Sequence, residues 1–255
     1  MLHSGEDVMR ATTIEFRLRM AINAAFIILG FWSPWIETLK IGKRVSLIEW
    51  LSLQLSRTGI ASFGTAISSL LALALVLASA AVVLRISGTA WLGPGTVNSV
   101  DMVAGGTMVD GPYRFLRNPL YIGLWCMVAA IAFLMPVTGA LFAVVLVTFF
   151  MIRLTLGEEA FLSTRLGESY RIYLRSVPRF IPRLRGAPPA TGAKAHWLRA
   201  SLAELVPIGA LAGIIVFWRN YDVALAGRVI LIFFGASLVV RAFLPVSVVS
   251  VAPER

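Results

Sequence analysis

The run "IASFGTAISSLLALALVLASAAVVL", residues 60–84, contains 25 residues and not one charged side chain. A helix needs about 20 apolar residues to cross the hydrocarbon core of a bilayer, so this run can span it with some tilt. The whole chain agrees, because 58% of its 255 residues are hydrophobic and 14% are charged, whereas soluble domains carry roughly 25% charged residues. The mean hydropathy is +0.82. The sequence therefore predicts an all-α integral membrane protein.

Five further apolar segments predict a polytopic bundle of about six transmembrane helices. Pro136 and Gly139 break the sequence between two of them and predict a tight helical hairpin. Pro207 predicts a kink in another. The stretch "VSLIEWLSLQLSR", residues 45–57, is typical of an interfacial helix on the outer surface. The five segments cover residues 18–35, 120–135, 137–152, 202–218 and 223–244.

The distribution of basic residues orients the predicted bundle. The chain carries 23 Lys and Arg against 13 Asp and Glu. With six spans and the N-terminus inside, seventeen of the basic residues fall in cytoplasmic segments and six in outer ones. This asymmetry predicts that both termini are cytoplasmic. We attribute the positive charge to this topology and to anionic lipid headgroups, and expect no nucleic-acid partner, because no basic module with interleaved aromatic residues is present.

The rare reactive residues exclude several classes of site. Cys126 is the only cysteine, and His3 and His196 are the only histidines. One cysteine excludes an internal disulfide and a cysteine-based zinc site, and two distant histidines leave little for a metal cluster or a Ser-His-Asp triad. We expect no metal site. The first twenty residues are too long and too acidic for the n-region of a signal peptide, and no small-residue cleavage site follows.

Composition divides the chain into three predicted regions. Residues 1–104 hold the N-terminal transmembrane helices and the interfacial segment. Residues 105–186 form a core of one helical hairpin and polar segments around it. Residues 187–255 form a linker and a two-helix transmembrane tail, because "RLRGAPPATGAKA" is rich in Pro, Ala and Gly.

The first polar segment is "GPYRFLRNPLYIG", residues 111–123. Proline is favoured in the first turn of a helix, so Pro119 predicts that a helix begins there. Arg117 and Asn118 then stand at its N-terminus, where free N–H groups and the helix dipole favour a carboxylate or phosphate. Gly123, one turn further on, permits close approach of a backbone or ligand.

The second polar segment follows the fourth apolar run and includes "GEEAFLSTRLGESYRIYLRSVPRFIP". Glu158 and Glu159 come directly after the span, where carboxylates are costly unless they are partnered. Tyr170 and Tyr173 are three residues apart and share a helical face. The prolines of the closing "VPRFIP" predict an extended segment.

The two polar segments flank one hairpin, so they can converge on the cytoplasmic side. Taken singly, the arginines are typical of topology anchors, the glutamates of a solvated helix end and the tyrosines of an interfacial aromatic belt. Together they suit a ligand with an anionic and a cationic end. An amino acid moiety is one example, with its carboxylate toward Arg117 and its ammonium toward Glu158 or Glu159.

The ordered pattern from residue 105 to residue 182 resembles a superfamily of membrane-embedded methyltransferases. The pattern is Arg-(His/Asn)-Pro-x-Tyr-x-Gly, two apolar helices, Glu-Glu, Gly-x-x-Tyr-x-x-Tyr and a closing proline segment. It is similar to the isoprenylcysteine carboxyl methyltransferase and phospholipid N-methyltransferase superfamily. Asn118 stands where the eukaryotic enzymes usually have histidine, which resembles the bacterial-type branch.

The resemblance implies S-adenosyl-L-methionine as methyl donor, a cytoplasmic cofactor pocket and a lipophilic acceptor that enters from the bilayer. The acceptor could be an isoprenylcysteine carboxylate, a phospholipid amine or a small thiol. The implied catalytic residues are Arg153, Glu158 and Glu159. The implied cofactor-binding residues are Tyr113, Arg117, Asn118, Pro119, Tyr121, Gly123, Glu158, Glu159, Tyr170, Tyr173, Pro178, Ile181 and Pro182.

The implied reaction is direct methyl transfer, in which the protein mainly aligns the reacting groups. A carboxylate or thiolate acceptor needs no base, whereas an amine would lose its proton, and Glu158 or Glu159 could accept it. One alternative is an NADPH-dependent sterol-type membrane reductase, which shares a similar Arg-His-Pro-x-Tyr-x-Gly segment. Another is a non-enzymatic membrane protein. The Glu-Glu pair and the paired tyrosines favour methyl transfer.

Overall fold

The computed structural model describes residues 9–97, 110–183 and 185–243. These residues are helical or irregular, and the only β pairing among them is the isolated bridge between Ser46 and Pro136. The predicted all-α class is therefore confirmed. The helices, in order, are α2 Thr13–Arg17, α3 Arg19–Trp32, α4 Trp35–Thr38, α5 Leu47–Arg57, α6 Phe63–Leu92, α7 Pro94–Val97, η1 Gly111–Arg114, α8 Pro119–Ala132, α9 Val137–Ser176, α10 Trp197–Ala203, α11 Leu205–Asn220 and α12 Val223–Phe243.

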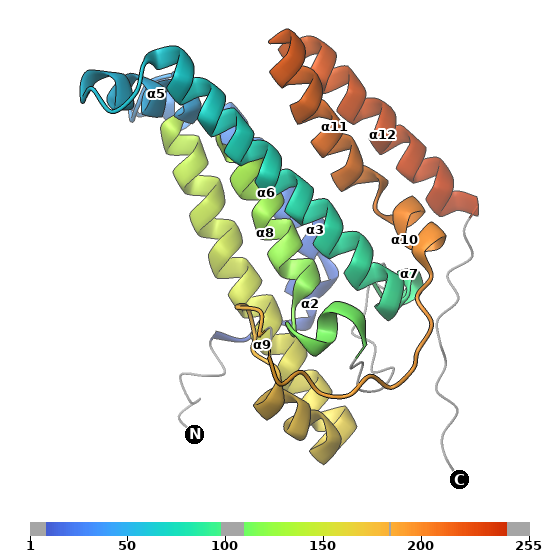
Figure 1. The fold of residues 1–255 in the computed structure, drawn as a ribbon. Helices are drawn as coiled ribbons and strands as arrows, with labels where there is room; N and C mark the ends of the chain where they lie inside the picture. The colour runs from blue at the N-terminus through green and yellow to red at the C-terminus, as the bar shows by residue number, and fades with distance from the viewer. Residues whose placement is uncertain (1–8, 98–109, 184, 244–255) are drawn as a thin grey trace.

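Six apolar helical segments run between the two ends of an elongated bundle (Figure 1). Among the described residues, α6, α9 and α12 are long and apolar enough to cross a membrane, and α10 with α11 would form a fourth span if the bent pair is one. Helices α3 and α8 are apolar but shorter, with 14 residues each. The predicted membrane helix bundle is confirmed, with three or four spans by length.

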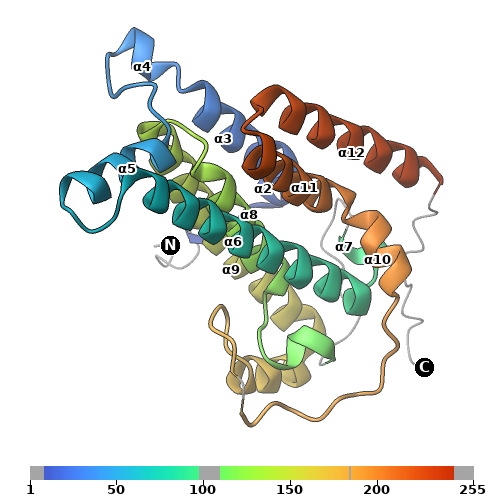
Figure 2. The ribbon, with the colours of Figure 1, turned by 45° about the horizontal axis from the view of Figure 1, so that its top comes forward.

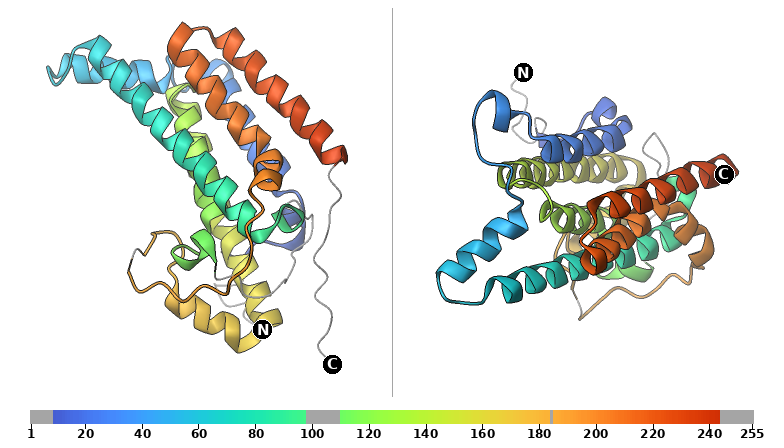
Figure 3. Two further views of the ribbon diagram at one scale, coloured as in Figure 1. Left: turned by 45° about the vertical axis from the view of Figure 1, so that its right-hand side comes forward. Right: turned by 90° about the horizontal axis from the view of Figure 1, so that it is seen from above.

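Helix α6 lies at the centre of the packing. Its Ala78 and Ala81 meet Met127 and Ala130 of α8 and Ile214 of α11 in one buried cluster. Seen from above, α3 and α9 lie on one side of α8 (Figure 3). The α11–α12 hairpin packs against α6 and α8 through α11. Small residues let helices approach closely where lipid leaves little hydrophobic drive for association.

The crossing of α3 and α9 depends on two glycines. A Cβ at Gly139 would collide with the carbonyl oxygen of Gly30. The two backbones are therefore in direct contact, which only glycine allows at this point.

The predicted interfacial helix forms as α5. Its N-cap is Ser46, whose backbone N–H donates to the Glu49 carboxylate at 3.1 Å in a capping box. The start of α5 is attached to the α8–α9 turn, because the N–H groups of Leu47 and Ile48 donate to the carbonyls of Met135 and Phe133 at 2.8 and 3.0 Å. Its place at a bilayer surface stays a prediction.

Helix α9 continues far beyond the apolar run 137–152 that predicted a span. It extends through Glu158 and Glu159 to Ser176, because no residue in this stretch stops a helix before Gly167. At Gly167 the backbone has φ 61° and ψ −135°, and the last turns of α9 fold back beside the bundle (Figure 1).

The kink predicted at Pro207 was wrong. The chain bends by 68° at Glu204, between α10 and α11. Pro207 is the third residue of α11, where a missing N–H costs no intrahelical hydrogen bond.

The Pro/Ala/Gly-rich segment between α9 and α10 passes along the end of the bundle beside η1 (Figure 2). The Asp110 carboxylate accepts hydrogen bonds from the backbone and the hydroxyl of Thr191, and the first of these is 2.9 Å long. Arg114 Nε donates to the Pro188 carbonyl at 2.7 Å. The Thr191 hydroxyl lowers the pKa of Asp110, which keeps its charge. The segment thus fixes η1. The start of the predicted core at residue 105 lies outside the described residues.

Candidate functional site

The candidate site lies at the end of the bundle that carries α2, η1 and the last turns of α9 (Figure 1). Helix α8 begins at Pro119, as predicted. The loop before it runs beside the predicted extended segment, because Arg117 N–H donates to the Pro178 carbonyl and Arg183 N–H to the Phe115 carbonyl, both at 2.9 Å. Asn118 caps no N–H of α8, and its Nδ2 donates to the Arg179 carbonyl at 3.2 Å.

Three charged side chains, those of Arg117, Glu159 and Arg179, form a triad. Glu159 lies at its centre and is only 8% exposed. Arg117 Nη1 donates to its Oε1 at 2.7 Å. Arg179 forms a bidentate pair, with Nε to Oε1 at 3.1 Å and Nη2 to Oε2 at 2.7 Å. The Glu159 hydrogen bond raises the pKa of Arg179. Such forked pairs are both strong and directional.

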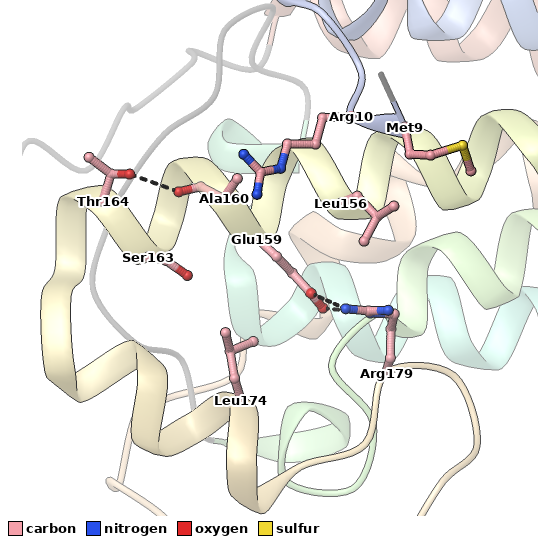
Figure 4. A pocket seen from close by; sticks show the side chains of 9 residues that line it. All are labelled: Met9, Arg10, Leu156, Glu159, Ala160, Ser163, Thr164, Leu174 and Arg179. Carbon is pink, nitrogen blue, oxygen red and sulfur yellow. Dashed lines mark hydrogen bonds and ion pairs between the residues drawn. The ribbon is translucent and has the colours of Figure 1, made fainter. Parts of the chain in front are cut away.

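A hollow of about 660 Å³ opens beside this triad (Figure 4). Glu159 and Arg179 form its polar wall, and one turn further along α9 Ser163 and Thr164 line it. The remaining wall comes from Leu156 and Ala160 of α9, from Leu174, and from Met9 and Arg10 of the N-terminal segment.

A second hollow, of about 420 Å³, is lined by the proline segment and shares Leu174 with the first. Arg117 lines it together with Pro178, Ile181 and Pro182, so four of the predicted cofactor residues meet there. Its other lining residues are Leu174, Arg175, Ser176, Val177 and Arg183.

Glu158 faces a different neighbour from Glu159. The Tyr121 hydroxyl of α8 donates to its Oε2 at 3.1 Å. Tyr121 packs against the cluster of α2, α3 and α9 side chains that includes Phe16 and Leu154. The two adjacent glutamates therefore point to separate places, one to the arginines and one into the helix bundle.

The predicted tyrosine pair lies on one face of α9 and is buried. The rings of Tyr170 and Tyr173 are 5.7 Å apart, and both pack against Val177. The Tyr173 hydroxyl donates to the Tyr113 carbonyl at 2.9 Å and so connects the last turns of α9 to η1.

Arg153 and Gly123, also predicted site residues, contact α2 and α6. Arg153 Nη2 donates to both carboxylate oxygens of Glu15 in α2, at 3.0 and 2.9 Å. This ion pair attaches Arg153 to α2. Gly123 faces α6, where an added Cβ would lie 2.6 Å from Cγ of Arg85.

Several residues of the site were not predicted. Arg179 was noticed only as part of the proline segment, and its position inside "VPRFIP" was the signal that could have singled it out. Glu204, which is 2% exposed, pairs with Arg85 of α6 at 2.6 Å and accepts a hydrogen bond from Thr89 at 2.6 Å. A carboxylate at the start of an apolar run was the signal for this pair.

Comparison with known proteins identifies relatives of part of this chain. Residues 69–169 match the family model described as phospholipid methyltransferase. The predicted resemblance is confirmed for this segment. Protein-S-isoprenylcysteine O-methyltransferase of Schizosaccharomyces pombe is 38% identical over 77 residues.

That match covers 29% of this chain and 32% of the yeast protein, so the chain spans about a third of the curated relative's length. No solved structure matches the chain. The methyltransferase-like segment includes α8, the α8–α9 turn and the two glutamates. It ends before Tyr170, and the α10–α12 tail lies outside it.

Proposed function

We propose that this chain is an integral membrane methyltransferase that uses S-adenosyl-L-methionine and acts on a lipophilic acceptor. The single observation that carries the proposal is the Arg117–Glu159–Arg179 triad beside the two hollows. The triad joins the start of α8, the extension of α9 and the proline segment, which are the elements of the matched pattern and its continuation. We place it on the cytoplasmic side, because the basic residues of the chain gather there.

The side chains present fit the amino acid end of such a cofactor. Glu159 can accept from an ammonium group, and the guanidinium groups of Arg117 and Arg179 can donate to a carboxylate. Arg117 Nε is buried and has no hydrogen-bond partner, so one donor at the triad is still available. A buried donor without a partner requires an explanation, and an anionic ligand supplies one.

The chemistry that the cofactor supplies when bound is an activated methyl group on a sulfonium. The protein's contribution is to bind and align. Glu159, Arg117 and Arg179 bind the amino acid end of the cofactor. The α9 side chains that line the larger hollow exclude water from one side. Glu158, which the Tyr121 hydroxyl orients at 3.1 Å, is placed to accept a proton if the acceptor carries one.

Arg153 is assigned a positioning role in this proposal. Its bidentate contact with Glu15, together with the hydrogen bond from Ala11 N–H to its own carbonyl at 3.0 Å, attaches the N-terminal segment to α9. Met9 and Arg10 of that segment line the larger hollow.

Ligand binding tests the proposal. The full chain, purified in detergent, is titrated with S-adenosylhomocysteine and separately with NADPH in a calorimeter. We expect saturable binding of S-adenosylhomocysteine and none of NADPH. Binding of NADPH without S-adenosylhomocysteine would overturn the proposal in favour of a reductase. Binding of neither ligand would also contradict the proposed methyltransferase activity.

A further inference from the structure

Two stretches of the bent helix α9 line the larger hollow. The stretch before Gly167 contributes Glu159 and, one turn further on, Ser163. The stretch after Gly167 contributes Leu174 (Figure 4). The bend therefore gives the hollow a continuous helical wall that begins at the triad and continues past Ser163.

The side chains that line this hollow differ in what they offer a ligand. Of the nine lining residues, three are charged and four are apolar. The other two, Ser163 and Thr164, carry hydroxyl groups. A hydroxyl donates one hydrogen bond and accepts two, so these two side chains suit the uncharged polar groups of a ligand.

The two hydroxyls are not equivalent. Thr164 Oγ1 donates to the Ala160 carbonyl, one turn back in α9, at 3.0 Å (Figure 4). Serine and threonine often make this bond inside a helix. The Ser163 hydroxyl makes neither this bond nor any other with the residues that the structure describes. It is therefore the lining hydroxyl that is available to a ligand.

Ser163 lies on the same face of α9 as Glu159. The two residues are four apart in sequence, which separates them by about 6 Å along the helix axis. In the opposite direction along this face the hollow is lined by the apolar Leu156. A ligand whose charged end is bound at Glu159 therefore finds its partner for an uncharged hydroxyl in the direction of Ser163.

We propose that the Ser163 hydroxyl forms a hydrogen bond with a ribose hydroxyl of S-adenosyl-L-methionine. In this cofactor the ribose follows the amino acid moiety beyond the sulfur, and its hydroxyls are uncharged. The inference rests on the proposed function and adds a residue for the nucleoside end, whereas the triad binds the amino acid end. The sequence resemblance did not single out Ser163, although it lies within the matched residues 69–169.

The test removes each partner of the proposed hydrogen bond in turn. The full chain in detergent, as wild type and as Ser163→Ala, is titrated in a calorimeter with S-adenosylhomocysteine and with its analogue that lacks the ribose hydroxyls. We expect Ser163→Ala to raise the Kd for S-adenosylhomocysteine about fivefold, the size of one neutral hydrogen bond. The two proteins should bind the analogue equally, because the partner of Ser163 is then missing.

Ser169→Ala is the matched control on the same helix. The Ser169 hydroxyl donates to the Leu166 carbonyl at 2.9 Å, and Ser169 lines neither hollow. Its affinity for S-adenosylhomocysteine should stay within about twofold of wild type. Ser163→Ala should melt at or above the wild-type temperature, because alanine is the stronger helix former. Lost affinity in that variant then reports a lost contact and not a loss of folding.

Several results would overturn the inference. Equal Kd values for S-adenosylhomocysteine in wild type and Ser163→Ala would show that the hydroxyl does not contact the cofactor. An equal loss for the analogue would place Ser163 against another part of the ligand, and an equal loss in Ser169→Ala would make the effect a general change in α9. If wild type binds no S-adenosylhomocysteine, the proposed function itself fails, and the inference fails with it.

Discussion

Glu159 holds more of the candidate site together than any other side chain described. Two guanidinium groups from different elements bond to its two oxygens, within 3.1 Å. Arg117 is nearly buried and Arg179 is 38% exposed, so the triad lies at the boundary between the bundle and the larger hollow. This position makes the carboxylate accessible to a ligand while keeping its geometry rigid.

Removing the charge of Glu159 should therefore weaken cofactor binding. We expect Glu159→Gln to raise the Kd for S-adenosylhomocysteine about tenfold or more, because a charge-assisted hydrogen bond contributes roughly 1.5–3 kcal/mol. Glu168→Gln is the matched control, since Glu168 forms only an exposed pair with Arg171 at 3.7 Å. Calorimetry on both variants measures the effect. Equal affinity in wild type and Glu159→Gln would remove Glu159 from the cofactor site.

Residue types and order predicted part of this site. Because the two polar segments flank one hairpin, the sequence predicted that Arg117 and a glutamate could converge. In the structure Arg117 Nη1 lies 2.7 Å from Glu159 Oε1. The role of Arg179 could not be predicted, because the segment from Arg153 to Arg199 contains nine basic residues including those two, and sequence alone does not show which of them folds back. That choice depends on the turn at Val177 and Pro178.

At the scale of elements, helix α2 is attached to α9 by the Glu15–Arg153 pair. The hydrogen bond from Arg153 lowers the pKa of Glu15 below 4.5, and partial burial opposes it. A carboxyl with a lowered pKa in the folded state stabilises the fold above its unfolded pKa. The stabilisation is lost as the pH falls through the folded pKa.

This pair predicts a pH-dependent stability difference. We expect wild type to exceed Glu15→Gln in free energy of unfolding by about 0.5–1 kcal/mol at neutral pH, because the pair is only partly buried. The difference should persist down to about pH 4.5 and shrink below it. Thermal unfolding in detergent at several pH values measures it. A difference that grows with acidity would contradict the assigned pair.

The bend of α9 makes a second prediction at this scale. Gly167 has positive φ with ψ −135°, a conformation nearly restricted to glycine, while nothing lies within 4 Å of where its Cβ would be. We expect Gly167→Ala to cost about 1–3 kcal/mol of stability through backbone strain alone. Gly227→Ala in α12 is the control, because its Cβ site is also open and its backbone is helical. Equal melting temperatures for Gly167→Ala and Gly227→Ala would exclude backbone strain at Gly167.

The sequence predicted which apolar helices exist, but it did not predict where α9 ends. The hydropathy runs located every apolar helix, and Pro119 marked the start of α8. Hydropathy falls where α9 leaves its apolar run, but helix formation does not, since the polar residues from Arg153 onward are also helix formers. The bend falls at Glu204, whose side chain pairs with Arg85 across the bundle, and no local pattern contains that pair.

At the scale of the whole molecule, the α10–α12 tail is part of the bundle. Arg85 and Glu204 are 119 residues apart in sequence and form a bidentate pair, with Nε to Oε2 at 2.6 Å and Nη2 to Oε1 at 3.1 Å. Sequence showed the tail but not this contact. The side chain of Cys126 in α8 packs against the cluster that includes Ile214 of the tail, so its thiol reports on the docking.

Breaking this pair should loosen the tail. We expect Glu204→Gln to lower the free energy of unfolding by about 3 kcal/mol, because it leaves Arg85 without its buried partner, and to speed labelling of Cys126 by a membrane-permeant maleimide. Glu37→Gln is the control, since its pair with Arg44 is exposed. If the labelling rate of Cys126 and the melting temperature match those of wild type in both variants, the Arg85–Glu204 pair does not hold the tail in place.

The central claim is tested most directly by methyl transfer. Membrane vesicles containing the full chain are incubated with methyl-labelled S-adenosylmethionine, and the labelled product is identified by mass. The account predicts labelled lipophilic product with wild type and a strong loss with Glu159→Gln at the same cofactor concentration. Folded wild-type protein that transfers no methyl to any lipid or small molecule of the membrane, or that transfers it equally well without the Glu159 carboxylate, would contradict the account.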